Sequence, residues 1–166
     1  SCTTSDLDPT VAQSKDAATG ITKVDNLYAA LKGAYSRMQS SGYWGGAIIL
    51  TNEVRTDNCY SNGNSGRYTT QGGFQYSENT GYVWDNCYGV ISSANLIISQ
   101  DLDNLEGDKD WANYLVGQAY AVRALAHYDL LRTYGQMHTG GNLGVPVVHT
   151  YLSGASSDEE LYPARN

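Results

Sequence analysis

Positive charge is scarce in this chain, and that scarcity excludes one class of partner. Ten Lys and Arg residues stand against 17 Asp and Glu residues, which gives a formal net charge of −7 over 166 residues. A nucleic-acid-binding surface needs clustered basic side chains to neutralise phosphates. We therefore expect no nucleic-acid partner, and the length fits one domain with an adequate core.

Long apolar runs and the common catalytic motifs are also missing. No apolar run approaches the roughly 20 residues that a membrane-spanning helix needs. The histidines His127, His138 and His149 lack the HExxH spacing of metal ligands, and no C-x-x-C is present. Neither a G-x-S-x-G motif nor a phosphate-binding loop occurs. We expect no metal, no cofactor and no catalysis. No signal peptide is visible, so we expect a mature or trimmed chain.

Tyrosine takes the place of the missing charge. The chain holds 14 Tyr but one Phe, and only 16% of its residues are charged, against about a quarter in a typical soluble domain. A tyrosine has an apolar ring face and a polar tip, so it suits wet recognition surfaces as well as helix packing. Several of these tyrosines fall at helical spacing, which predicts partial burial for most of them.

Apolar periodicity predicts an all-α chain with three main helices. The first follows Thr22 and ends at Ser40–Gly42, and the second begins at Trp84 and ends near residues 100–103. The third covers 111–134, with Asp110 as its N-cap and Gly135 as its C′ residue. Residues 82–134 would then form an αα-hairpin. Residues 1–20 are polar and aperiodic, so we expect an extended N-terminal tether there.

The third predicted helix carries two apolar stripes, which predicts that it packs on both sides. One stripe is Leu115, Ala119, Val122 and Ala126, and the other is Tyr114, Ala121, Leu125 and Tyr128. Arg123 is expected to tie helices or a loop carbonyl together, because a buried charge must be paired. His127 is expected to be a satisfied packing residue. Asp129 and Arg132, three apart, are expected to pair on the helix surface.

The segment 42–81 is rich in Gly, Asn and Tyr and forms a long predicted loop after the first helix. Loops this long are usually functional or disordered, and the aromatic content argues against disorder. A neutral sugar needs an aromatic plate and directional hydrogen-bonding groups. The loop offers such groups as candidate ligand-binding residues: Asp57, Asn58, Tyr60, Arg67 and Tyr68. Alternatively, the loop only covers the helices, and its charges are solvated.

The order of several short motifs resembles the SusD/RagB family of nutrient-binding lipoproteins. The motifs are Gly117-Gln-Ala, Arg123-Ala, Tyr128-Asp-Leu-Leu-Arg, Tyr134-Gly and Gly144-Val-Pro-Val, together with Leu7-Asp-Pro, Tyr28-Ala-Ala-Leu and Pro163-Ala-Arg. Gln118 departs from the family, which usually has Glu there. The resemblance implies helical hairpins like tetratricopeptide repeats, decorated by long loops. It also implies that residues 21–166 are the N-terminal helical region of a longer protein.

For function, the resemblance implies a cell-surface protein of the outer membrane that captures oligosaccharides for a SusC-like TonB-dependent transporter. Cys2 resembles the family's lipid-attachment residue, so the membrane would be reached only through a lipid anchor. The family's glycan sites use an Asp and an Arg from the loop after the first helix, which would correspond to Asp57 and Arg67. A peptide-capturing RagB-like protein and a helical-repeat scaffold for a protein partner remain alternatives.

Cys59 and Cys87 are left once Cys2 is set aside. In an extracytoplasmic protein this pair could form a disulfide. Two unpaired thiols are favoured, because a bridge needs a close Cα approach that sequence cannot show.

Overall fold

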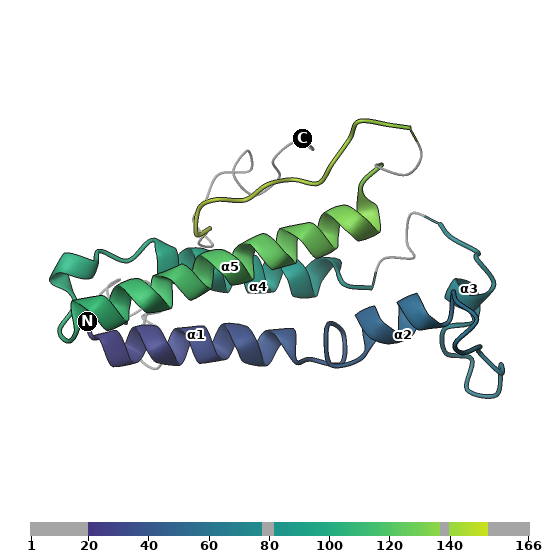
Figure 1. Ribbon diagram of the computed structural model, residues 1–166, viewed down its shortest axis with the longest axis horizontal. Helices are drawn as coiled ribbons and strands as arrows, with labels where there is room; N and C mark the ends of the chain where they lie inside the picture. Colours follow the sequence, from purple (N-terminus) through teal and green to yellow (C-terminus); the bar gives the residue numbers. More distant parts are fainter. Residues whose placement is uncertain (1–19, 78–81, 137–139, 153–166) are drawn as a thin grey trace, which may run out of the picture.

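A computed structural model describes residues 20–77, 82–136 and 140–152, and within these ranges the regular structure is helical (Figure 1). The elements are α1 (Val24–Met38), α2 (Ala47–Glu53), α3 (Thr69–Gly72), α4 (Trp84–Ile98), the 3₁₀ turn η2 (Leu102–Asn104) and α5 (Lys109–Tyr134). The all-α prediction is confirmed. None of the described helices is both long enough and apolar enough to cross a membrane. The predicted tether 1–20 lies outside the described residues except for Gly20.

The core lies between α1, α4 and α5, which run side by side (Figure 1). The hairpin of α4 and α5, joined through η2, was predicted and is confirmed, and α1 packs along it. The largest buried aliphatic side chains come from all three helices: Leu27, Leu31, Ile91, Ile97, Leu115 and Leu130. Each such side chain contributes about 1.5–3 kcal/mol when fully buried. This shared apolar seam fixes the three long helices as one body.

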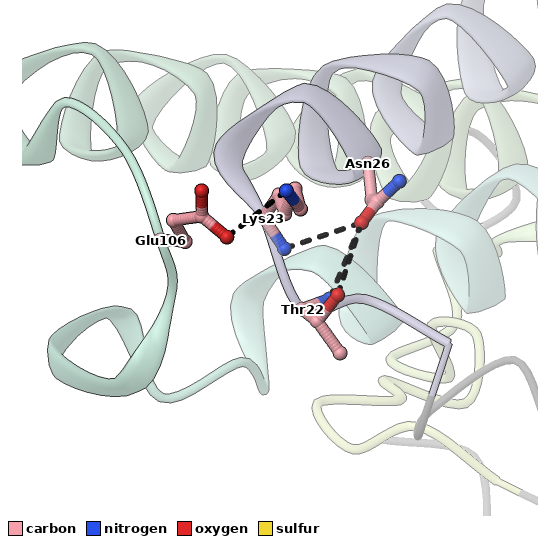
Figure 2. Close-up of polar contacts among 4 residues, drawn as sticks. All are labelled: Thr22, Lys23, Asn26 and Glu106. Atoms are coloured by element: carbon pink, nitrogen blue, oxygen red, sulfur yellow. Dashed lines mark hydrogen bonds and ion pairs between the residues drawn. The ribbon is translucent and has the colours of Figure 1, made fainter.

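The first turn of α1 is tied to the turn that precedes α5 (Figure 2). Val24 N donates to Glu106 O at 3.0 Å, and Glu106 N donates to Thr22 O at 3.1 Å. The Asn26 side-chain oxygen accepts from Lys23 N at 3.2 Å and so caps the helix start. Lys23 Nζ lies 3.0 Å from Glu106 Oε2, but this pair is exposed and contributes little. The backbone bonds therefore set the position of α1.

The ends of α5 differ from the prediction. Asp108, not Asp110, is the N-cap, since its carboxylate accepts from Asp110 N at 2.9 Å and from Trp111 N at 3.2 Å. Asp110 lies in the first turn, where its charge still favours the helix dipole. Gly135 ends the helix with φ −74°, so it is not a left-handed C′ residue. A Cβ there would come 2.6 Å from Leu131 O, and this close approach requires glycine.

The prediction that α5 packs on both sides is wrong. The first stripe is buried as expected: Leu115, Ala119, Val122 and Ala126. The second stripe is exposed: Tyr114, Ala121, Leu125 and Tyr128. α1 and α4 pack on α5 without covering this second stripe, and tyrosine tolerates water because its hydroxyl is polar. Periodicity alone cannot separate a covered face from a tyrosine-rich exposed one.

The predicted loop 42–81 holds two short helices, α2 and α3, at the end of the bundle opposite the start of α1 (Figure 1). The turn from α1 into α2 is tight, because a Cβ on Gly45 would lie 2.0 Å from Gln39 O. Tyr43 and Ile48 are buried in the core and anchor the start of the segment. The segment is therefore a packed extension of the helical body in its first third.

Candidate functional site

The five predicted ligand-binding residues lie on two neighbouring stretches at this end of the molecule. Asp57, Asn58 and Tyr60 follow α2, and Arg67 and Tyr68 precede α3. The Ser61 hydroxyl donates to the Arg67 carbonyl at 2.8 Å, which holds the two stretches together. Within the described chain, no hydrogen bond or ring contact joins one of the five side chains to another.

These side chains differ in how free they are to meet a ligand. The Tyr60 side chain is 83% exposed, and in the described part of the chain no hydrogen bond engages it or the Asp57 carboxylate. The Asn58 amide donates to Glu53 Oε2 at 2.8 Å, so it is partly used. Arg67 is exposed, and its backbone N–H donates to Ser65 Oγ at 3.3 Å. The loop thus presents an open ring beside unpaired polar groups.

Two aromatic residues of this loop have left-handed backbone conformations. Tyr68 has φ 57° and Phe74 has φ 53°, a conformation that costs roughly 1–2 kcal/mol for a residue with a Cβ. Strained residues of this kind concentrate at functional sites. The exposed aromatic residues of the segment are Trp44, Tyr60, Phe74 and Tyr76. Their number favours a recognition surface over a loop that merely covers the helices.

Asp129 was expected on the helix surface in a pair with Arg132, and this prediction is wrong. Its side chain is only 2% exposed. The Tyr43 hydroxyl donates to Asp129 Oδ2 at 2.7 Å, and the Trp44 indole donates to the same oxygen at 3.0 Å. Burial, together with this hydrogen bond, raises the pKa of Tyr43, so the phenol stays a neutral donor. Asp129 therefore fixes the segment after α1 onto the end of α5.

A polar hollow of about 60 Å³ lies beside Asp129, and sequence reasoning missed it. Its walls come from α2 and Arg55 on one side and from α5 on the other: Ile48, Asn52, Arg55, Asp129, Arg132 and Thr133. The Arg55 guanidinium donates through Nε to Thr51 O at 2.9 Å and through Nη2 to Asn52 Oδ1. Arg55 precedes Asp57 by two residues, so the hollow adjoins the candidate loop.

Arg123 links α5 to α4 and to a loop carbonyl, as predicted. Its Nη1 donates to Asn95 Oδ1 at 2.9 Å and to His149 O at 3.2 Å. The Asn95 amide donates in turn to Val148 O at 3.1 Å and to Thr150 O at 3.0 Å. These bonds hold the extended segment 143–150 against α4 and α5.

His127 is satisfied by the same segment, as expected for a packing residue. Its Nδ1 lies 3.0 Å from Arg123 O, and Val148 N donates to its Nε2 at 3.2 Å. The ring therefore carries its proton on Nδ1 and accepts on Nε2. Burial lowers the pKa of His127, and the neighbouring charge of Arg123 lowers it further. The imidazole is held neutral.

Trp84 packs against Tyr88 and Tyr134, with ring centroids 5.0 Å away in both cases, yet the side chain is partly exposed. The Tyr134 hydroxyl accepts from three successive backbone N–H groups at the start of α4: Tyr82 at 3.0 Å, Val83 at 3.2 Å and Trp84 at 3.2 Å. The α4 N-cap residue offers no side-chain cap of its own. A distant phenol thus caps this helix.

The remaining predictions concern thiols and metal ligands. Cys59 is exposed and Cys87 is buried, and both are free, so the favoured unpaired state is confirmed. Burial raises the pKa of the Cys87 thiol to about 11, which keeps it unreactive.

Gln118 accepts from the Tyr35 hydroxyl at 2.8 Å and so links α5 to α1. The described ranges hold no group of three or more His, Cys, Asp or Glu able to bind a metal ion. Cys2 and His138 lie outside those ranges.

The structure combines a helical hairpin with a long aromatic loop and with the extended segment 143–150. These features define a class of helical proteins, and comparison with known proteins identifies the family. The SusD-like_3 family model, described as "Starch-binding associating with outer membrane", matches residues 6–162. The chain belongs to the SusD-like family, which confirms the resemblance found in the sequence.

Individual relatives agree with this assignment. SusD-like protein P2 of Formosa agariphila is 32% identical over 117 residues, which cover 68% of this chain and 23% of the relative. A putative sugar binding protein from Bacteroides vulgatus superposes with a TM-score of 0.72 at 31% identity, covering 88% of this chain and 33% of that one. A SusD superfamily protein from the same species gives 0.67 at 28% identity, covering 80% and 32%. The chain therefore spans about a quarter to a third of these relatives.

Proposed function

We propose that this chain is the N-terminal helical region of a surface lipoprotein that binds glycans without transforming them. It would capture oligosaccharides at the outer membrane and pass them to a SusC-like TonB-dependent transporter. Membership in a family described as starch-binding and associated with the outer membrane supports the ligand class and the location. The observation that carries the proposal is the open Tyr60 ring in a loop with Asp57 and Arg67.

The chemistry of the loop suits sugars. An exposed aromatic ring covers the apolar C–H face of a pyranose, while carboxylate, amide and guanidinium groups bond its hydroxyls. Asp57, Asn58, Tyr60, Arg67 and Tyr68 supply each of these groups within one surface segment. Exposed aromatics that are ordered in residues 42–77 also argue against a plain helical scaffold.

Affinity electrophoresis against a polysaccharide panel tests the proposal. We expect one glycan to retard the protein, and Tyr60→Ala or Arg67→Ala to abolish the retardation. The matched controls are Tyr114→Ala on α5 and Arg37→Ala on α1, which remove exposed side chains of the same types from helices outside the loop. Loss in the controls as well, or retention in both loop variants, would move the site elsewhere. If peptides bind and no glycan does, the protein captures peptides.

Attachment through Cys2 is tested separately. We expect Cys2→Ser, expressed with its native leader, to move the protein from the membrane fraction to the soluble fraction, because acyl chains on Cys2 would supply the anchor. The control Cys59→Ser should remain in the membrane fraction. Membrane retention of Cys2→Ser would refute the anchor while leaving glycan binding untouched.

A further inference from the structure

The hollow between α2 and α5 has the size of one small chemical group. Its volume of about 60 Å³ is several times the roughly 10–15 Å³ that one water molecule needs on the same measure. It therefore admits a group of several non-hydrogen atoms, such as the carboxylate or the hydroxymethyl group of a sugar. Arg55, just after α2, and Arg132, on α5, both line this space, and Asp129 lies in its wall.

The two positive charges of the hollow are not neutralised by Asp129. The donors on that carboxylate are the Tyr43 hydroxyl and the Trp44 indole, and in the part of the chain that the structure describes no ion pair joins it to either arginine. Arg132 has no hydrogen-bond acceptor within the same residues, and its guanidinium lies 5.7 Å from the Tyr128 ring centroid. A chain with net charge −7 thus carries a local site with an excess of positive charge.

Donors for an anion remain available from three side chains. Arg55 uses Nε and Nη2 on Thr51 O and Asn52 Oδ1, which leaves Nη1. The Asn52 amide nitrogen and the whole Arg132 guanidinium add further N–H groups, since no described hydrogen bond uses them. Arginine binds a planar carboxylate through two parallel bonds, which are stronger than neutral ones.

The Asp129 carboxylate in the wall of this space also has an oxygen open to a donor. Both donors on the buried Asp129 carboxylate use Oδ2, and Oδ1 has no described hydrogen bond. A ligand that offers only an anionic group would leave this oxygen unpaired, and a neutral hexose would leave the arginines unpaired. A group that carries a carboxylate next to a hydroxyl satisfies both sides.

We propose that the hollow is a subsite for the carboxylate of a uronic acid residue within the captured glycan. Arg55 and Arg132 bind the carboxylate, and Asp129 Oδ1 accepts from an adjacent sugar hydroxyl. Because Arg55 leads directly into Asp57, the same chain can lie across the Tyr60 loop while this substituent enters the hollow. The assignment rests on the glycan capture proposed above and specifies its substrate class.

Calorimetry with matched acidic and neutral chains tests this subsite. The probes are polygalacturonate, alginate and glucuronan oligosaccharides, each paired with its carboxyl-reduced form of the same length. We expect at least one uronan to bind about tenfold or more tightly than its reduced form, as charge-assisted hydrogen bonds require. Arg132→Met should remove that preference, Arg132→Lys should keep part of it, and Arg37→Met should keep all of it. Because Arg132 is exposed, we expect these substitutions to leave the thermal melting temperature unchanged. An unchanged melting temperature shows that the variants fold.

The outcomes separate this inference from the proposed function. Equal binding of acidic and reduced chains, or an Arg132→Met variant with its preference intact, overturns the subsite and leaves glycan capture standing. Preference for a sulfated neutral chain over every uronan overturns the carboxylate assignment. Binding of neutral glycans that Tyr60→Ala abolishes, without binding of any uronan, overturns the subsite alone. Absence of binding to every polysaccharide overturns both.

Discussion

Tyr134→Phe removes one oxygen atom and with it the cap of α4. The hydroxyl accepts from the N–H groups of Tyr82, Val83 and Trp84, and Val83 is completely buried. The phenyl ring that remains keeps its edge contact with Trp84 at 5.0 Å, so packing changes little. The variant therefore isolates the loss of hydrogen bonds from the loss of apolar contact.

The expected cost follows from the state of these three donors. A neutral hydrogen bond contributes about 1 kcal/mol net, and a buried donor left without a partner costs about 1–3 kcal/mol. Tyr82 and Trp84 are partly exposed residues whereas Val83 is completely buried, so we expect the Val83 amide to be the one left without a partner. We expect a loss of about 2 kcal/mol in the free energy of unfolding, which corresponds to about 4–8 °C in Tm for a chain of this size.

Urea unfolding followed by circular dichroism measures this loss. The matched control is Tyr128→Phe on the same helix, whose hydroxyl makes no hydrogen bond within the described ranges and whose side chain is exposed. It should change stability by less than about 0.5 kcal/mol. Faster amide hydrogen exchange at Val83 in Tyr134→Phe would locate the effect. Equal stability of the two variants would refute the capping argument.

Three further perturbations have defined outcomes. Asn95→Ala removes two donors to the segment 148–150 and one acceptor for Arg123, so we expect a loss of about 2–3 kcal/mol in unfolding free energy, with faster proteolysis after residue 143. His127 has a folded pKa below its unfolded value of about 6.5, so stability should fall as pH drops below that value, and His127→Gln should lose this part of the pH dependence in chemical unfolding. Gly45→Ala should abolish cooperative melting, because its Cβ would lie 2.0 Å from Gln39 O, while Gly33→Ala, with open space around it, should not.

The long helices could be predicted because their signal is local. Leu27, Leu31 and Leu115 recur at helical spacing, and each is buried as the pattern requires. The start of α5 was misplaced by two residues because Asp108 and Asp110 both carry carboxylates that can cap a helix, and only the backbone shows which one does. α2 was missed as a helix because its apolar run of four residues is too short to show a period.

The candidate site was less predictable because it depends on contacts that are distant in sequence. Asp129 meets Tyr43 across 86 positions, and neither residue has a neighbour that announces the other. The spacing of Asp129 and Arg132 predicts an ion pair on the helix surface. Tertiary packing instead buries Asp129 against Tyr43 and Trp44. The hollow has the same origin, since Arg55 and Arg132 line it together although they are far apart in the sequence.

The clasped segment 143–150 has a consequence for protein engineering. Its Val145 side chain is buried in the core, and its Val148 side chain is partly buried against it. The hydrogen bonds that hold it reach its main chain: Tyr88 donates to the Pro146 carbonyl, and Asn95 donates to the carbonyls of Val148 and Thr150. The exposed side chains of Val147 and His149 take no part in holding the segment. These two positions can accept a fluorophore or a spin label without loosening the clasp, which offers a reporter placed directly on the helical body.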